Sequence, residues 1–216
     1  MTEARTTTPR ERYRGQVRAE IKEYAREQIA TAGASALSLN AIAKRMGMSG
    51  PALYRYYAGR DELITDLIRD AYRSLADTFR AAAGSGADLA GLAHALRSWA
   101  LADPQRYFLV YGTPVPGYHA PADITDIASE TMAVILDACA ALPDGGGGGT
   151  PFDAHVGGHR QWADGHPATP AALHRALTFW TRLHGVLSLE LAGHFTGMSF
   201  DPALLYAAEL DDLAAR

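Results

Sequence analysis

Cysteine is nearly missing from this sequence of 216 residues, and long apolar runs are missing altogether. The single Cys139 excludes an internal disulfide and a zinc site built on cysteines. No apolar run approaches the ~20 residues that span a bilayer, and the polar, arginine-rich start does not read as a signal peptide. Strand-like alternation of apolar and polar residues is missing as well. We therefore expect a helical protein of the reducing cytoplasm, with no membrane partner.

Charge is distributed unevenly along the chain. The formal net charge is −4, but residues 1–60 contain 11 basic and 5 acidic side chains, a net of +6. Residues 61–216 contain 9 basic and 19 acidic side chains, a net of −10. A small basic region beside a larger acidic one predicts a polyanionic partner for the first region, although a chance cluster on a solvated helix would give the same count.

Apolar residues recur every three to four positions in the first part of the chain, which is typical of helices. Val17, Ile21 and Ile29 share one face of a predicted helix over residues 11–32. Two short helices follow, one over 39–46 and one ending near residue 57. Ser38 and Ser49 are their predicted caps. A fourth helix is predicted over 61–83.

The rest of the chain has the same helical period. It predicts a helix over 88–102, a short helix after Pro104, and three further helices over 122–141, 170–195 and 202–214, with a long loop over 143–168. The predicted fold class is all-α. We divide it into a helix-turn-helix DNA-binding domain over 11–60 and a helical ligand-binding and dimerisation domain over 61–216.

Residues 38–57 combine two short predicted helices, a tight turn at residues 47–49 and a basic surrounding sequence. This combination describes a helix-turn-helix, in which the second helix enters the major groove of DNA. The small residues 50–52 at the start of that helix permit a close approach to DNA. Leu53 and Tyr57 lie one turn apart and are predicted to face the small core.

The stretch from Ser38 to Leu63 resembles the N-terminal domain of the TetR family of transcriptional regulators. The matching elements are Ile42-Ala43, the turn Gly47-Met48-Ser49, the run Leu53-Tyr54-Arg55-Tyr56-Tyr57, and Arg60-Asp61-Glu62-Leu63. Tyr57 stands where the family has Phe, so its hydroxyl needs a partner, and Arg60 replaces a Lys. The resemblance implies a sequence-specific DNA-binding regulator, in particular a repressor that a small-molecule effector releases from a palindromic operator. We expect no enzymatic activity and no cofactor.

The resemblance also implies which side chains meet double-stranded DNA. Phosphates are expected to be contacted by Ser38, Asn40, Lys44, Ser49, Tyr54 and Arg60. Base edges are expected to be met by Gly50, Pro51, Ala52, Arg55 and Tyr56, with Arg55 able to bind a guanine bidentately. A basic arm, formed by Arg10, Arg12 and Arg14, is expected to reach the flanking backbone or the minor groove. A backbone contact alone for Arg55, and a disordered tail in place of the arm, are the alternatives.

Two later segments resemble a subgroup of this family. The first is Asp103-Pro104-Gln105-Arg106-Tyr107-Phe108. The second is Trp180-Thr181-Arg182-Leu183-His184-Gly185, and this second segment matches a Trp-x-x-x-His-Gly signature. We expect an effector pocket lined by Trp99, Tyr107, Phe108, Tyr111, Met132, Leu136, Phe179, Leu183 and His184. An aromatic stripe at helical spacing is more often core than pocket, so core packing is the alternative, with His184 as a hydrogen-bonded core histidine.

The predicted helix over 170–195 has a near-heptad apolar seam. Its members are Leu173, Leu177, Trp180, His184, Leu187, Leu191 and Phe195. By resemblance, the last two helices form the interface of a homodimer. The expected interface residues are Leu173, Leu177, Trp180, Leu187, Leu191, Leu205 and Leu213, with Gly185 and Gly193 allowing close backbone approach. The alternative is that the seam belongs to the core of one chain.

A loop rich in histidine supports a second hypothesis from another functional class. Residues 152–166 contain His155, His159 and His166 with Asp153 and Asp164, residue types that bind metal ions. The alternative function is a helical metal-dependent enzyme that uses this loop. No helical spacing fixes these side chains, so we expect no metal site. The glycine run at 145–149 lacks the Gly-Lys-Ser/Thr of a phosphate-binding loop.

Overall fold

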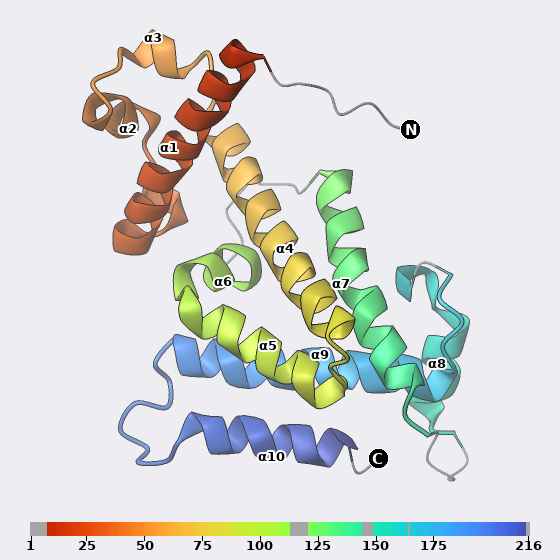
Figure 1. The fold of residues 1–216 in the computed structure, drawn as a ribbon. Coiled ribbons are helices and arrows are strands. Elements are labelled where there is room, and N and C mark those ends of the chain that lie inside the picture. The colour runs from red at the N-terminus through yellow and green to blue at the C-terminus, as the bar shows by residue number, and fades with distance from the viewer. Residues whose placement is uncertain (1–7, 113–120, 144–148, 164, 215–216) are drawn as a thin grey trace. The chain divides into compact units, whose positions relative to one another are not determined.

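A computed structural model describes residues 8–112, 121–143, 149–163 and 165–214, and it is helical without strands over these ranges (Figure 1). The all-α prediction is therefore confirmed. Contacts divide the described chain into two units, residues 8–69 and residues 70–112 together with 121–214. The division falls inside the long helix α4, Arg60–Gly84.

The first unit contains α1 (Pro9–Ala32), the 3-10 turn η1 (Ala34–Ala36), α2 (Leu39–Arg45), α3 (Gly50–Leu53) and the start of α4. α1 begins where Thr8 and Glu11 form a capping box. It ends at Gly33, whose φ of +78° suits glycine. Ile21, Ile42 and Leu53 are fully buried in the core of this unit.

The second unit is built around one central helix. Its elements are the rest of α4, α5 (Leu89–Ala102), α6 (Pro104–Tyr111), α7 (Ala122–Ala140), α8 (Pro151–Gly158), the 3-10 turn η2 (Gln161–Ala163), α9 (Pro170–Leu191) and α10 (Pro202–Ala214). α9 packs against α7, α8 and α10, and α10 lies alongside it (Figure 1). Phe79, Leu96, Ile135 and Phe179 are fully buried in this core.

The structure corrects three predicted boundaries. The segment 143–168 is not one loop, because Thr150 and Asp153 form a capping box that starts α8. α9 ends at Leu191 rather than at residue 195, since Gly193 adopts φ +77° and the N–H of His194 donates to the carbonyl of Leu189. The second helix of the helix-turn-helix, α3, ends at Leu53 and is followed by turns, not by helix up to residue 57.

No helix among the described residues combines the length and the apolar character that crossing a membrane requires.

Candidate nucleic-acid interface

The helix-turn-helix consists of α2, the turn at residues 46–49 and α3. Ser38 caps α2 by accepting a hydrogen bond from the N–H of Ala41 at 3.3 Å. Gly47 has a φ of +66°, which glycine adopts without strain. The N–H of Met48 then donates to the carbonyl of Ala43 at 2.8 Å and closes the turn. The start of α3 is thereby fixed beside α2.

Most of the predicted DNA-contacting side chains are exposed. The exposed residues are Arg10, Arg12, Arg14, Ser38, Asn40, Lys44, Ser49, Pro51, Tyr54 and Arg55, and the half-buried ones are Gly50, Ala52, Tyr56 and Arg60. Tyr54 is 47% exposed, which is unusual for a large aromatic residue inside a folded unit. Leu53 and Tyr57 are fully buried, as predicted for the residues that face the core.

Two of the sequence-based expectations for this unit are wrong. Arg10, Arg12 and Arg14 lie in the first turns of α1 and are neither an arm nor a disordered tail, because the Thr8 capping box starts the helix before them. Ser49 stands in extended backbone before α3, but its side chain makes no capping hydrogen bond.

Arg60 has an intramolecular contact that the sequence did not predict. Its Nη2 donates to the carbonyl of Ala34 at 2.8 Å, and its Nη1 lies 3.9 Å from Oδ1 of Asp61. Arginine has five N–H donors where lysine has one ammonium group. Through one of these donors Arg60 links the start of α4 to η1.

The hydroxyl of Tyr57 finds its partner in Asp66, a residue that sequence reasoning did not single out. It donates to Oδ2 of Asp66 at 2.7 Å. Burial and this hydrogen bond raise the pKa of Tyr57. Burial also acts to raise the pKa of Asp66, but the hydrogen bonds from Tyr57 and Arg18 and the charge of Lys22 outweigh it and lower that pKa. The Tyr at position 57 was the one signal in the sequence for a buried acceptor.

In the second unit, the two segments that resemble the subgroup meet each other. Tyr107 of α6 is fully buried, and its hydroxyl lies 3.0 Å from Nδ1 of His184 and 2.8 Å from Oγ of Ser188. The Tyr107 and His184 rings stack with centroids 5.6 Å apart. Burial lowers the pKa of His184 to about 3, so its imidazole is neutral. His184 is thus a hydrogen-bonded core histidine.

Most of the predicted effector-binding residues pack in the core. Trp99, Tyr107, Leu136, Phe179, Leu183 and His184 are buried, and Phe108, Tyr111 and Met132 are half-buried. The Tyr111 ring contacts those of His184 and Trp180, with centroids 4.3 and 5.6 Å away. Within the described chain, the Tyr111 hydroxyl and Nε2 of His184 are buried without a hydrogen-bond partner.

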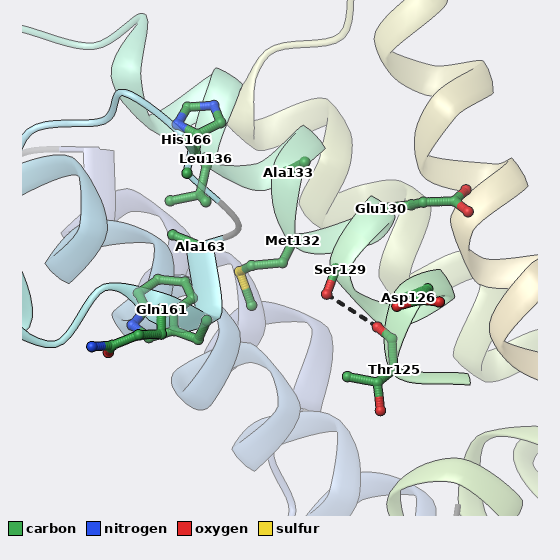
Figure 2. A pocket seen from close by; sticks show the side chains of 12 residues that line it. Thr125, Asp126, Ser129, Glu130, Met132, Ala133, Leu136, Gln161, Ala163 and His166 are labelled. Carbon is green, nitrogen blue, oxygen red and sulfur yellow. Dashed lines mark hydrogen bonds between the residues drawn. The ribbon is translucent and has the colours of Figure 1, made fainter. Parts of the chain in front are cut away.

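A pocket of about 630 Å³ lies between α7 and the segment that contains η2 (Figure 2). Only Met132 and Leu136 of the predicted effector-binding residues line it, and Figure 2 shows Met132 directed from α7 toward η2. The other lining residues are Thr125, Asp126, Ser129, Glu130, Ala133, Gln161, Trp162, Ala163, Gly165 and His166. The sequence could not place this pocket, because η2 lies in the segment predicted as a loop.

One wall of the pocket is tied to α4. The carboxylate of Glu130 lies 2.7 Å from Nη1 of Arg73 and 2.5 Å from Nη2 of Arg80, both on α4. On another side, Nδ1 of His166 accepts from the N–H of Ala168, so its Nε2 donates to Asp137 at 3.0 Å. A molecule that entered the pocket would therefore meet an apolar surface beside charged groups that reach α4.

The predicted dimer seam packs against the chain's own core, and four of its seven side chains stay partly exposed. Leu173, Leu187 and Leu213 are buried, and Leu177, Trp180, Leu191 and Leu205 are half-buried. Phe195 and Gly193 lie beyond the end of α9. The exposed positions of the two helices include Thr181, Gly185, Leu189, Leu204 and Ala208, with Leu204 70% exposed. A Cβ added to Gly185 would meet nothing within 4 Å in the described chain, so its own fold does not require glycine there.

The histidine-rich segment engages its donor side chains in separate pairs. The ring of His155 on α8 stacks with that of His159, the residue after the helix; Asp153 pairs with His174 at 2.7 Å, and His166 binds Asp137. No group of three His, Cys, Asp or Glu side chains that could hold a metal ion occurs among the described residues, and Asp164 lies outside them.

Two family models match the two parts of the chain. Residues 21–67 match the model described as bacterial regulatory proteins, tetR family. Residues 89–213, more than half of the chain, match the model described as tetracyclin repressor-like, C-terminal domain. The resemblance of residues 38–63 is thereby confirmed, and it extends over the second unit.

Named relatives and solved structures agree with these matches. The HTH-type transcriptional regulator Rv1816 of Mycobacterium tuberculosis is 36% identical, and the alignment covers 94% of this chain and 92% of the relative. The structure of regulatory protein SCO4313 is 78% identical with a TM-score of 0.89, covering 97% of this chain and 100% of that one. A bacterial regulatory protein in the tetR family from Rhodococcus RHA1, 20% identical, has a TM-score of 0.60 over 93% of this chain and 96% of its own and shares the fold.

Proposed function

Because this chain belongs to the TetR family of bacterial regulatory proteins, we propose that it is a homodimeric repressor that leaves a palindromic operator when a small molecule binds. It is a helix-turn-helix transcriptional regulator that works on DNA, and we assign the cytoplasm as its location. The observation that carries the proposal is the exposed group of polar and basic side chains on and beside α2 and α3. The net charge of +6 over residues 1–60 supports a DNA partner.

We assign two roles to the residues of the first unit. Arg55 reads a base, since it is exposed just after α3 and its guanidinium fits the edge of guanine. Asn40 and Lys44 on α2 are exposed and bind backbone phosphates, which fixes the register of α3 in the groove. A Cβ at Gly50 would lie 3.5 Å from Oδ1 of Asn40, so these two predicted contacts are neighbours.

The proposed dimer uses the exposed positions of α9 and α10 together with the half-buried seam residues Leu177, Trp180, Leu191 and Leu205. Leu189 of α9 and Leu204 of α10 are exposed apolar side chains, and Gly185 offers close backbone approach to a second copy. A two-fold dimer carries two recognition segments about 34–36 Å apart, the spacing of successive major grooves. The operator is then palindromic.

Selection of bound duplexes from a random-sequence pool tests the proposal. We expect an enriched motif with two inverted half-sites, centred about 10 base pairs apart or somewhat more. An enriched single half-site would contradict the dimer, and a pool that stays random at low salt would contradict sequence-specific binding. The double variant Leu189→Ser with Leu204→Ser serves as the matched control, because it weakens the dimer and leaves α3 unchanged.

We place the effector in the pocket between α7 and η2. Its lining combines Met132, Leu136 and Trp162 with polar groups, which suits a small molecule with an apolar body and a few hydrogen-bonding groups. Glu130 connects the lining with Arg73 and Arg80 of α4, the helix that continues into the first unit. A ligand that shifts Glu130 changes the contacts of α4, and this coupling links occupancy of the pocket to DNA binding.

A library of small molecules, scored by the rise in melting temperature, tests this site. Met132→Trp fills the pocket and leaves the DNA-binding residues unchanged. We expect the compounds that release the selected duplex to stabilise the natural chain and not this variant. If they stabilise both proteins equally, the effector binds elsewhere.

A further inference from the structure

Asp66 of α4 lies at the centre of a polar network in the first unit. Its Oδ2 accepts the hydrogen bond from the Tyr57 hydroxyl at 2.7 Å and one from Nη2 of Arg18 at 3.1 Å. Its Oδ1 accepts from Nη1 of Arg69 at 3.2 Å, and Nζ of Lys22 lies 3.7 Å from Oδ2. The Asp66 side chain is 17% exposed, so water shields these contacts only in part.

The same network reaches the backbone of the segment that follows α3. Nη1 of Arg18 donates to the carbonyl of Tyr56 at 3.0 Å, and Nη2 of Arg14 donates to the carbonyl of Arg55 at 3.3 Å. The last carbonyls of a helix and its following turn have no partner within the helix itself. Here two arginines of α1 supply those partners. The backbone that carries Arg55 is therefore held from α1.

Arg18 can hold this backbone only in one orientation. Its guanidinium uses one nitrogen for the Tyr56 carbonyl and the other for Asp66, and its Cζ lies 4.2 Å above the centre of the Tyr57 ring. A planar guanidinium that binds two acceptors at once cannot rotate without losing one of them. Asp66 thus fixes Arg18 through a hydrogen bond to its guanidinium. It also fixes Tyr57 through the hydrogen bond from the tyrosine hydroxyl, so both contacts hold the segment that follows α3.

We infer that Asp66 is a positioning residue for base recognition, which acts through Arg18 and Tyr57 and does not touch DNA itself. Its carboxylate links three elements, which are α1, α4 and the turn that follows α3. It thereby sets the direction in which the Arg55 side chain leaves the backbone. It also offsets part of the positive charge of Arg18, Lys22 and Arg69. The inference depends on the proposed reading of bases by residues 50–56.

If Asp66 has this role, its loss should lower the affinity for specific DNA without lowering the affinity for non-specific DNA. Asp66→Asn keeps the shape of the side chain but removes its negative charge, which loosens Arg18 and makes the net charge near the proposed DNA-binding surface more positive by one. We expect the affinity for a duplex selected by the natural protein to fall about tenfold, the size of one lost bidentate base contact. The affinity for a scrambled duplex should stay equal or rise, since phosphate attraction alone determines it.

Arg18→Lys is the second variant, because it retains the charge and loses the two-pronged contact. It should lower the ratio of specific to scrambled affinity several-fold at an unchanged salt dependence. Glu20→Gln, at an exposed position of α1, makes the same charge change as Asp66→Asn and should leave the ratio unchanged.

Fluorescence anisotropy with both duplexes over a range of salt concentrations measures these effects, with the melting temperature recorded in parallel. The inference is overturned if Asp66→Asn and Arg18→Lys keep the ratio within twofold. It is also overturned if both affinities fall together in step with the melting temperature, because that result indicates a purely structural role. If the natural protein itself prefers no duplex, the proposed function fails.

Discussion

The two units of this chain differ in what surrounds their buried polar groups. In the first unit, a partly buried carboxylate, Asp66, gathers three cations and a tyrosine hydroxyl next to an exposed basic surface. In the second unit, apolar and aromatic side chains fill a large core, and His184 is neutral inside it. Both units have an apolar core, but the polar network around Asp66 in the first unit also lies beside the proposed DNA-binding surface, whereas the core around Phe179 in the second unit serves stability. Variants in each unit should therefore affect different measurements.

The largest expected effect comes from the core of the second unit. Phe179 is fully buried, and Phe179→Ala leaves a cavity that should reduce the free energy of unfolding by about 3–5 kcal/mol. Urea denaturation measures this loss. The base preference of the protein that remains folded should not change. A changed base preference would show that the core of the second unit affects DNA recognition as well as stability.

A smaller effect is expected at the proposed DNA-binding surface on and beside α2 and α3. Arg55→Ala should cost about 1–3 kcal/mol of preference at one base position of each half-site. Because Arg55 is exposed, the melting temperature should stay unchanged. Selection from random duplexes checks this, with Lys44→Ala for comparison, which should weaken all sequences alike and flatten the salt dependence. If Arg55→Ala leaves the motif intact, Arg55 contacts only the backbone.

The smallest effect concerns pH and the buried imidazole. His184 has a pKa of about 3 in the folded chain and an ordinary value of 6.5 when unfolded. As the pH falls through 6.5 the unfolded chain takes up a proton that the folded chain does not, so the contribution of His184 is complete only well above pH 6.5 and is lost as the pH falls toward 3. Between pH 7 and pH 6 this loss amounts to about 0.7 kcal/mol.

Urea denaturation at these two pH values separates this contribution. His184→Gln should lose the extra pH dependence, and His94→Gln, at an exposed position of α5, should keep it. Equal pH dependence in the natural protein and His184→Gln would mean that His184 is accessible to water and titrates normally.

The first unit was the more predictable from sequence because its signals are local. Ser38, Gly47 and Pro51 mark the ends of short elements by their own backbone preferences, and the structure has helix boundaries beside them. What the sequence did not reveal there depends on contacts distant along the chain. Arg18 and Asp66 are 48 residues apart, and nothing in their spacing indicates that they meet.

The second unit was less predictable because packing, not local preference, decides which face of each helix is buried. The repeat of Leu173, Trp180 and Leu187 predicts an apolar seam correctly, but the same repeat serves an intrachain core and a dimer interface equally well. α8 was missed because glycine and histidine in residues 152–166 favoured a loop, whereas the capping box at Thr150 starts a helix. The pocket beside α7 depends on η2 and could not be seen without it.

The central claim is that two copies of this chain bind one DNA duplex, each through the proposed DNA-binding surface on and beside α2 and α3. Basic side chains contact the phosphates, and residues 50–56 contact the bases. Sedimentation of the purified protein with the selected duplex, repeated over a range of salt concentrations, tests it most directly. We expect two chains on one duplex, with an affinity that decreases steeply as salt increases and exceeds that for a scrambled duplex at least a thousandfold. A single chain that binds both duplexes equally well would contradict the account.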